Sequence, residues 1–188
     1  MINTLSKQDV IVYLFTGFIE SGKTSFIQRL LEDRRFGNGK RTLVLLCEEG
    51  ATEFATECFS VPNVAFCTCE SESDFTEANL SDCARRFGVD RILVEYNGMW
   101  SLDTFFSALP DNWILFQSFF FADSTTILMY NANLRQLTYD KLSRCSFIVF
   151  NRVSDSTELL PLHKLVRAAS SQAKIIFEYT DGRQVSDP

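Results

Sequence analysis

Between positions 16 and 25 the chain reads Thr16-Gly17-Phe18-Ile19-Glu20-Ser21-Gly22-Lys23-Thr24-Ser25. This stretch fits the phosphate-binding pattern G-x-x-x-x-G-K-S/T at every fixed position. The preceding residues 10–15 form a short run of β-branched and aromatic side chains, which favours a buried strand. After the stretch, apolar side chains recur at helical spacing, namely Phe26, Ile27, Leu30 and Leu31. The sequence therefore predicts a P-loop, a phosphate-binding turn between a strand and a helix.

The fixed residues of this loop each have a physical role in holding a phosphate. Loop N–H groups and the positive end of the following helix surround the anion, and glycines at 17 and 22 permit the tight path. Lys23 supplies a positive charge to the outer phosphates, and the Thr24 hydroxyl can ligate magnesium. A chance glycine turn before a surface lysine is the alternative. The expected nucleotide-binding residues of the loop are Gly17, Glu20, Ser21, Gly22, Lys23, Thr24 and Ser25, with the Glu20 side chain facing solvent.

Length and charge restrict the class of protein. At 188 residues the chain has the size of one ordinary α/β domain, and we expect a single domain over residues 1–188. The net charge of -6 argues against a nucleic-acid partner, because no basic field is available to replace the counterions of a phosphate backbone. No apolar run approaches the roughly 20 residues that cross a bilayer, and residues 1–7 lack the layout of a signal peptide. We therefore expect a cytoplasmic protein without membrane insertion.

Beyond the loop, short apolar runs alternate with amphipathic segments, which predicts strands that alternate with helices. Residues 51–62 lack a clear period and are expected to form a loop or a short helix. The expected strands cover 42–47, 64–66, 91–95, 113–121 (ending at Ala122-Asp123), 147–150 and 174–177. The expected helices cover 75–87 (capped by Ser73-Asp74 and ended by Gly88), 102–109, 132–142 and 159–169. This order predicts an α/β fold, a three-layer P-loop NTPase domain with a mostly parallel sheet covered by helices on both faces.

Ligands of such sheets bind at the carboxyl ends of the strands, and one acidic residue stands at such an end. Glu95 closes an apolar strand, and Gly98 follows three residues later. In a P-loop protein, a carboxylate here can reach magnesium or the attacking water, and a glycine N–H can reach the outer phosphate. A glutamate that merely caps a turn is the alternative.

A second candidate element for nucleotide binding follows the strand at 147–150. The sequence Asn151-Arg152-Val153-Ser154 stands where a guanine-reading N-K-x-D element is expected, with Asn151 available for the base and the Arg152 stem able to cover its face. Ser154 accepts hydrogen bonds more weakly than the aspartate of that element, and Asp155 comes one residue late. The choice between guanine and adenine therefore stays open.

The six cysteines are too dilute for a fold built on disulfides, and in a reducing compartment we expect them to be packed thiols or metal ligands. Only Cys67 and Cys69 lie close enough in sequence to indicate a site. Their sulfur atoms suit zinc or another transition metal, and half-buried free thiols are the alternative. The side chains that could complete such a site are Glu48, Glu49, Glu70 and the single histidine, His163.

With these motifs in place, the chain resembles the CobW-type P-loop GTPases, relatives of the urease and hydrogenase accessory proteins that insert nickel. The resemblance covers nearly the whole length. After the P-loop it is carried by Cys47-Glu48-Glu49-Gly50 where the family has N-E-F-G, Cys67-Thr68-Cys69-Glu70 in place of C-x-C-C, Glu95-x-x-Gly98 matching E-x-x-G, and Asn151-Arg152-Val153-Ser154 against N-K-x-D.

The resemblance implies binding of GTP or GDP with Mg²⁺ and a role in nucleotide-gated metal delivery or maturation of a cofactor-containing enzyme. The implied partner is a client metalloenzyme or transporter, and a homodimer stays open. Glu70 replaces the last cysteine of the family motif, which leaves a less sulfur-rich site for zinc or another transition metal. The smaller C-terminal domain of the family is expected to be absent.

Our leading hypothesis is a slow, magnesium-dependent GTPase. Lys23 and Glu95 are the expected catalytic residues, and Thr24 and Glu95 are the expected magnesium ligands. No arginine finger is evident in the sequence, so unaided turnover should be slow. The alternatives are a nucleotide-binding switch or scaffold subunit that does not hydrolyse, and an ATP-preferring hydrolase, the latter motivated by Ser154.

Overall fold

The apolar runs of the sequence form one eight-stranded sheet in the computed structural model, which describes residues 9–37, 39–48 and 54–187. The strand order is β3-β2-β4-β1-β5-β6-β7-β8, and every neighbouring pair is parallel except β7 and β8. The strands are β1 (Val10–Gly17), β2 (Thr42–Leu46), β3 (Val64–Thr68), β4 (Arg91–Glu95), β5 (Trp113–Asp123), β6 (Phe147–Val153), β7 (Lys174–Tyr179) and β8 (Gln184–Asp187).

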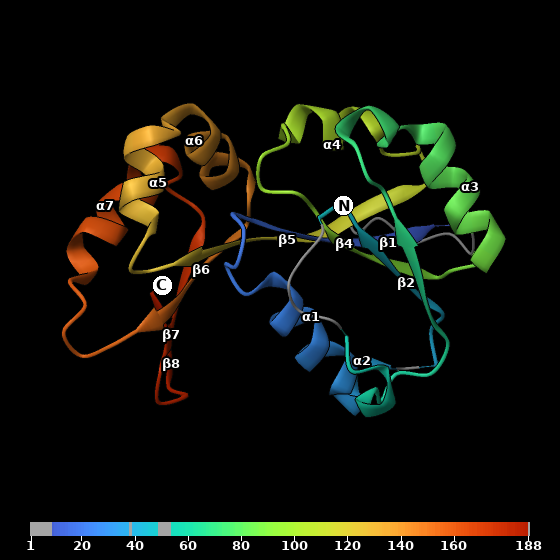
Figure 1. Cartoon of the computed structure of the whole chain (residues 1–188), viewed down its shortest axis with the longest axis horizontal. Coiled ribbons are helices and arrows are strands. Elements are labelled where there is room, and N and C mark those ends of the chain that lie inside the picture. The colour runs from blue at the N-terminus through green and yellow to red at the C-terminus, as the bar shows by residue number, and fades with distance from the viewer. Residues whose placement is uncertain (1–8, 38, 49–53, 188) are drawn as a thin grey trace.

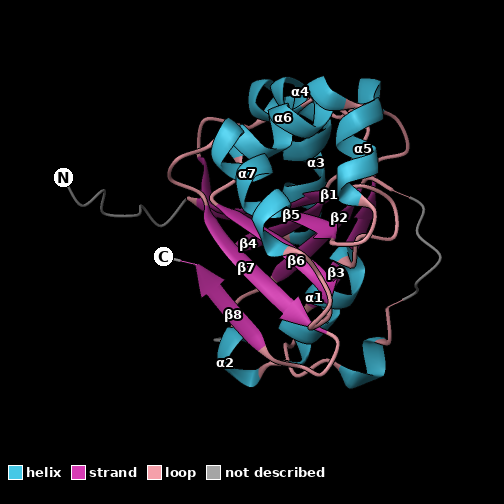
Figure 2. Cartoon of the chain, turned by 90° about the vertical axis from the view of Figure 1, so that its left-hand side faces the viewer, coloured by secondary structure: helices cyan, strands magenta, loops and turns pink. Residues whose placement is uncertain are grey.

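Helices cover both faces of this sheet, which confirms the predicted three-layer α/β architecture. Figure 1 shows α1 and α2 on one face and α3 to α7 on the other, and Figure 2 shows the same separation from the side. The helices are α1 (Lys23–Glu32), α2 (Arg34–Gly37), α3 (Glu77–Phe87), α4 (Leu102–Ala108), α5 (Ile127–Asn133), α6 (Arg135–Arg144) and α7 (Leu159–Ala169). Because the central strands β1, β2 and β4 are sandwiched between helices, they are buried on both sides, as their near-continuous apolar sequences require.

Helix α1 positions the P-loop against the sheet. Its inward residues Ile27 and Leu31 are fully buried and share a core cluster with Phe15 of β1. The helix ends at Asp33, whose extended backbone donates its N–H to the carbonyl oxygen of Leu30. Burial of these apolar side chains, each contributing about 1.5–3 kcal/mol, fixes the amino-terminal end of α1 beside the end of β1.

Three local expectations differ from the structure. The side chain that caps α3 is Thr76 and not Ser73-Asp74, which lie in a 3₁₀ turn over Glu72–Asp74. The expected helix over 132–142 is two helices, α5 and α6, because the backbone of Leu134 leaves helical geometry at φ −128 and ψ 46. Strand β8 was not expected, since its four residues are largely polar and exposed.

Part of one family motif falls outside the described residues, namely Glu49 and Gly50, together with residues 51–53 of the expected loop. The remainder of that loop contains a 3₁₀ turn over Thr56–Cys58. Across the described ranges, no helix combines the length and the apolar character needed to cross a bilayer.

Candidate functional site

The P-loop lies between the end of β1 and the start of α1 and encloses the side chain of Lys23. The Lys23 ammonium donates to the carbonyl oxygens of Gly17, at 2.9 Å, and Phe18, at 3.1 Å. Its third contact is an ion pair with Glu48, where Nζ lies 2.6 Å from Oε2. Only 2% of the Lys23 side chain is exposed, so its positive charge is held inside the loop by oxygen atoms.

The glycines of the loop sit where a side chain would collide with neighbouring groups. Gly22 has a φ of +92°, and a Cβ on it would lie 2.7 Å from Nδ2 of Asn151. A Cβ on Gly98 would collide with the backbone oxygen of Gly17. Gly98, from the turn after β4, therefore approaches the P-loop backbone as closely as glycine allows. The structure thus brings the E-x-x-G turn and the P-loop together.

Thr24 and Glu95 place two oxygen atoms side by side at the floor of the site. The Thr24 hydroxyl donates to Oε1 of Glu95 over 2.5 Å. Burial raises the pKa of Glu95 above its ordinary value, although the Thr24 hydrogen bond and the charge of Lys23 oppose the shift. A hydroxyl and a carboxylate are the hard oxygen donors that Mg²⁺ prefers, so this pair fits a magnesium ion.

The residues at the end of β6 support the loop from the other side. Asn151 donates from Nδ2 to the carbonyl oxygen of Ser21 over 2.6 Å. Arg152, in left-handed geometry at φ 53, forms an ion pair with Asp123 and donates to the carbonyl oxygen of Glu20 over 3.0 Å. Asp123 thereby fixes the guanidinium across the outer rim of the P-loop.

These groups surround a cavity of about 290 Å³. Its lining contains the Glu20–Ser25 stretch, Glu48, Glu95 and Arg152. The Glu20 side chain belongs to an exposed residue, as its place in the loop requires. The Ser21 hydroxyl is buried at the P-loop without a hydrogen-bond partner in the described chain. The arrangement can bind a polyphosphate at the amino-terminal end of α1, with a magnesium site beside it.

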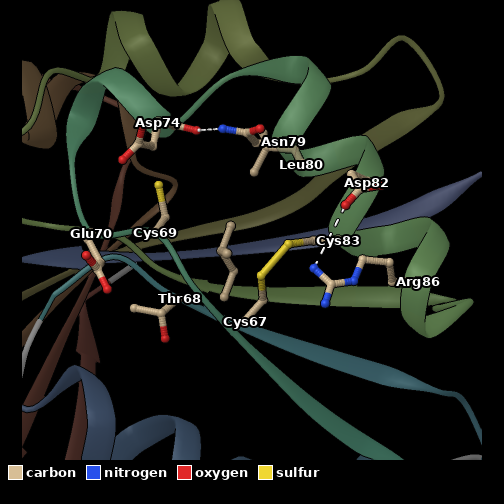
Figure 3. A pocket seen from close by; sticks show the side chains of 11 residues that line it. Cys67, Thr68, Cys69, Glu70, Asp74, Asn79, Leu80, Asp82, Cys83 and Arg86 are labelled. Atoms are coloured by element: carbon tan, nitrogen blue, oxygen red, sulfur yellow. Dashed lines mark hydrogen bonds and ion pairs between the residues drawn. A yellow bond between two sulfur atoms is a disulfide. The ribbon is translucent and has the colours of Figure 1, made fainter.

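The cysteine pair Cys67 and Cys69 lies elsewhere, at a separate cavity of about 320 Å³ between β3 and α3. The close-up in Figure 3 shows Cys67 bonded to Cys83 of α3, whereas the Cys69 side chain points away from that disulfide. Cys69 contacts Cys47 instead, and the hydrogen bond from the Cys47 thiol lowers the pKa of Cys69. The expectation that all six cysteines are thiols or metal ligands is therefore wrong for Cys67 and Cys83.

Four of the cysteines consequently form two separate pairs, Cys67 with Cys83 and Cys69 with Cys47, and these pairs do not share a metal centre. Within residues 9–37, 39–48 and 54–187, no three histidine, cysteine, aspartate or glutamate side chains are placed to hold a metal ion. With Cys67 in a disulfide, the Cys67–Cys69 pair does not offer two free thiols to zinc or a similar ion. His163, one suggested ligand, instead contacts Asp187, with Nδ1 at 3.1 Å from Oδ2.

Sequence reasoning missed the roles of three residues: two at the nucleotide site and one in a cysteine pair. The sequence suggests Glu48 as a metal ligand, whereas in the structure its carboxylate forms an ion pair with Lys23. Asp123 ends β5, an acidic strand end that could have indicated a site residue in the same way as Glu95. Cys83 lies sixteen residues from its disulfide partner, and no local pattern pairs the two.

Comparisons with known proteins agree with this geometry. The family model described as "CobW/HypB/UreG, nucleotide-binding domain" matches residues 11–177. No curated protein sequence matches the chain.

Among solved structures, hydrogenase maturation factor HypB from Archaeoglobus fulgidus has a TM-score of 0.65 at 17% identity, covering 93% of this chain and 83% of its own. The Zn(II)-bound YjiA GTPase from E. coli has a TM-score of 0.60 at 19% identity and covers 90% of this chain. This chain spans 57% of the YjiA chain. The signal recognition particle 54 kDa protein from Aeropyrum pernix K1, in complex with GDP, has a TM-score of 0.55 at 16% identity, covering 96% of this chain and 44% of its own.

These structural likenesses show the P-loop fold, and the family model shows the affiliation. The match runs from β1 into β7, and this range includes the P-loop, Glu95 and Asn151. The chain belongs to the CobW/HypB/UreG nucleotide-binding domain family.

Proposed function

We propose that this chain is a magnesium-dependent P-loop GTPase whose nucleotide state controls metal delivery or the maturation of a client metalloenzyme. The observation that carries the proposal is the position of Lys23. Its ammonium lies inside the turn of the P-loop, held by two backbone carbonyls and by Glu48. A buried lysine ammonium at the amino-terminal end of a helix is suited to an anion with several negative charges.

The neighbouring residues supply the remaining requirements of phosphoryl transfer. Loop N–H groups and Lys23 bind and orient the outer phosphates, and the Thr24 hydroxyl and Glu95 hold magnesium. When bound, magnesium neutralises part of the phosphate charge. Because Glu95 is buried, its carboxylate is shielded from competing solvent and keeps a fixed orientation toward the outer phosphate.

Glu48 pairs with Lys23 at the position where a phosphate would bind. Its Oε2 lies 2.6 Å from the Lys23 nitrogen, where it neutralises the charge that a phosphate would otherwise meet. A triphosphate must therefore replace the Glu48 carboxylate at Lys23. Since Glu48 directly follows Cys47, this replacement links nucleotide binding to the end of β2 and to the Cys47–Cys69 pair.

Hydrolysis is tested by measuring phosphate release from GTP with malachite green. We expect slow, magnesium-dependent release that Lys23→Ala reduces at least tenfold, since Lys23 is the cation directed at the phosphates. The matched control is Lys164→Ala, because Lys164 is an exposed lysine on α7 away from the loop. Equal release from wild type and Lys23→Ala contradicts the proposal. Tight GTP binding without single-turnover hydrolysis favours the non-hydrolysing switch instead.

The metal-delivery part is tested separately, because the cysteines present do not converge on a metal. Reduced and dialysed protein is titrated with zinc, cobalt or nickel, with and without GTP, and bound metal is measured by mass spectrometry. Metal binding that the double variant Cys67→Ser, Cys69→Ser abolishes supports this part. The matched control is Cys58→Ser, at an exposed free cysteine. If no metal remains bound in any nucleotide state, metal delivery by this chain is excluded.

A further inference from the structure

A second cavity adjoins the phosphate pocket on its Asn151 side. It measures about 530 Å³ and shares Gly22, Ser25 and Arg152 with the phosphate pocket. Ser25 lies on the first turn of α1, and Arg152 crosses the rim between the two cavities. This cavity, which we term the base cavity, therefore lies where the base of a nucleotide with its outer phosphates at Lys23 would have room.

The N-K-x-D position does not supply a carboxylate to the base cavity. Ser154 lies outside its lining, and its hydroxyl is 2.9 Å from that of Ser156 and 3.1 Å from that of Thr157. Asp155 forms an ion pair with Arg183 over 2.7 Å. Both residues are thus engaged in the turn before α7 and the β7–β8 hairpin. The carboxylate that usually distinguishes guanine is absent from this side of the cavity.

A different carboxylate lies in the lining of the base cavity. Glu178, near the end of β7, is one of two acidic residues there, the other being Glu32 of α1. Only 14% of the Glu178 side chain is exposed, and two donors hold it in place, Arg29 at 3.2 Å and Gln184 at 2.7 Å. Both of these hydrogen bonds end on Oε1. No hydrogen bond to Oε2 is formed by the part of the chain that the structure describes.

Glu32 is less suited to this role. It is an exposed residue, and its Oε1 accepts from Gln28 one helical turn earlier. The side chain of Glu178, in contrast, is shielded and is oriented by groups from two other elements, α1 and β8. A shielded and fixed carboxylate discriminates between ligands better than a mobile exposed one, because little side-chain entropy is lost on binding.

We propose that Glu178 is the residue that selects guanine over adenine in this chain, taking over the role that the serine at 154 cannot fill. The proposal rests on the proposed nucleotide-binding function. Guanine presents two donors side by side, N1–H and the 2-amino group. Oε2 of Glu178 can accept from one of them directly, and Oε1 can accept from the other in place of the exposed Gln184 amide. Adenine presents one amino group next to an acceptor nitrogen, and that acceptor repels the second carboxylate oxygen. The geometry thus favours GTP.

The test measures the affinities of GTP, ATP and inosine triphosphate by competition against one fluorescent nucleotide analogue. We expect wild type to prefer GTP over ATP by about 10- to 100-fold, the effect of hydrogen bonds to a charged group. Glu178→Gln keeps the shape but offers one acceptor and one donor, and should reduce this ratio to within about threefold of unity. Because both nucleotides are measured on the same protein, the ratio is insensitive to a fraction of unfolded variant.

Two matched variants and one substrate analogue make the test specific. Glu32→Gln removes the other acidic group of the cavity, and Ser154→Ala removes the hydroxyl at the N-K-x-D position; both should keep the wild-type ratio. Inosine triphosphate lacks the 2-amino group and should bind wild type about tenfold more weakly than GTP. This comparison uses the wild-type protein alone and needs no substitution.

The outcomes separate this inference from the proposed function. A wild-type ratio near unity, an unchanged ratio in Glu178→Gln, or a loss of preference in Ser154→Ala overturns the role of Glu178. If in these cases triphosphates still bind tightly and Lys23→Ala weakens them, nucleotide binding by the P-loop stands. If wild type binds neither GTP nor ATP, both the role of Glu178 and the proposed function are wrong.

Discussion

Replacement of Gly22 by alanine tests the packing of the P-loop against β6. Gly22 combines a φ of +92° with a neighbouring amide, since a Cβ would lie 2.7 Å from Nδ2 of Asn151. The positive φ costs an alanine about 1–2 kcal/mol. Displacing the Asn151 side chain also breaks its hydrogen bond to the carbonyl oxygen of Ser21, which costs about a further 0.5–1.5 kcal/mol. Gly22→Ala should therefore lower the free energy of unfolding by roughly 1.5–3.5 kcal/mol.

Gly182 provides the matched control. Its φ is +89°, close to that of Gly22, but a Cβ there would meet no atom within 4 Å. Gly182→Ala should therefore show only the backbone cost, about 1–2 kcal/mol. Urea denaturation followed by circular dichroism gives both values, because the unfolding free energy falls linearly with urea concentration.

A double-mutant cycle isolates the contact between Gly22 and Asn151. In the Asn151→Ala background the amide that meets the new Cβ is absent, so Gly22→Ala should cost no more than Gly182→Ala. The expected coupling is about 1 kcal/mol. Equal costs for Gly22→Ala and Gly182→Ala in the wild-type background, within about 0.5 kcal/mol, would show that Asn151 does not constrain the loop.

Three further predictions concern charge and covalent links. Because the pKa of Glu95 is raised above 4.5, the folded state binds the Glu95 proton more tightly than the unfolded state does. Protonated Glu95 therefore contributes fully to the free energy of unfolding below pH 4.5, and this contribution is lost as the pH rises through the raised pKa. Urea denaturation from pH 4 to 8 should show this loss in wild type and not in Glu95→Gln; parallel curves contradict it. Lys23→Met leaves Glu48 without its buried partner and should cost about 3 kcal/mol, most of which Lys23→Met with Glu48→Gln recovers; an unchanged cost in the double variant speaks against the ion pair. Reduction of Cys67–Cys83, which spans sixteen residues, should lower the unfolding free energy by about 3 kcal/mol in denaturation with and without reductant, and no linked peptide in a non-reducing digest would refute the pairing.

The fold and the P-loop could be predicted because their signals are local. Residues 10–15 are apolar, the motif follows at once, and Ile27 and Leu31 mark the buried face of the next helix. The break between α5 and α6 carried no such signal, since Leu134 is neither glycine nor proline. It adopts a non-helical backbone in the folded chain and is packed against the larger core cluster. Tertiary packing there overrides local propensity.

The contacts of the site could be predicted less well than its members. Gly17, Gly22, Lys23, Thr24, Glu95 and Asn151 come together as the motif order indicated. The ion pair between Lys23 and Glu48 depends on how β2 lies beside β4, and the pairing of Cys67 with Cys83 depends on how α3 packs on β3. Such contacts depend on three-dimensional register, which one sequence does not reveal.

The antiparallel strand β8 has a consequence for the behaviour of the protein in concentrated solution. Without it, the main-chain groups along one margin of β7 would be free to pair with another molecule. β8 occupies that margin, and Asp187 at its end contacts His163 and Arg167 of α7. The new margin is only four residues long, exposed and mostly polar, which makes it a poor template for intermolecular β-pairing. β8 therefore gives this side of the sheet a short and mostly polar edge.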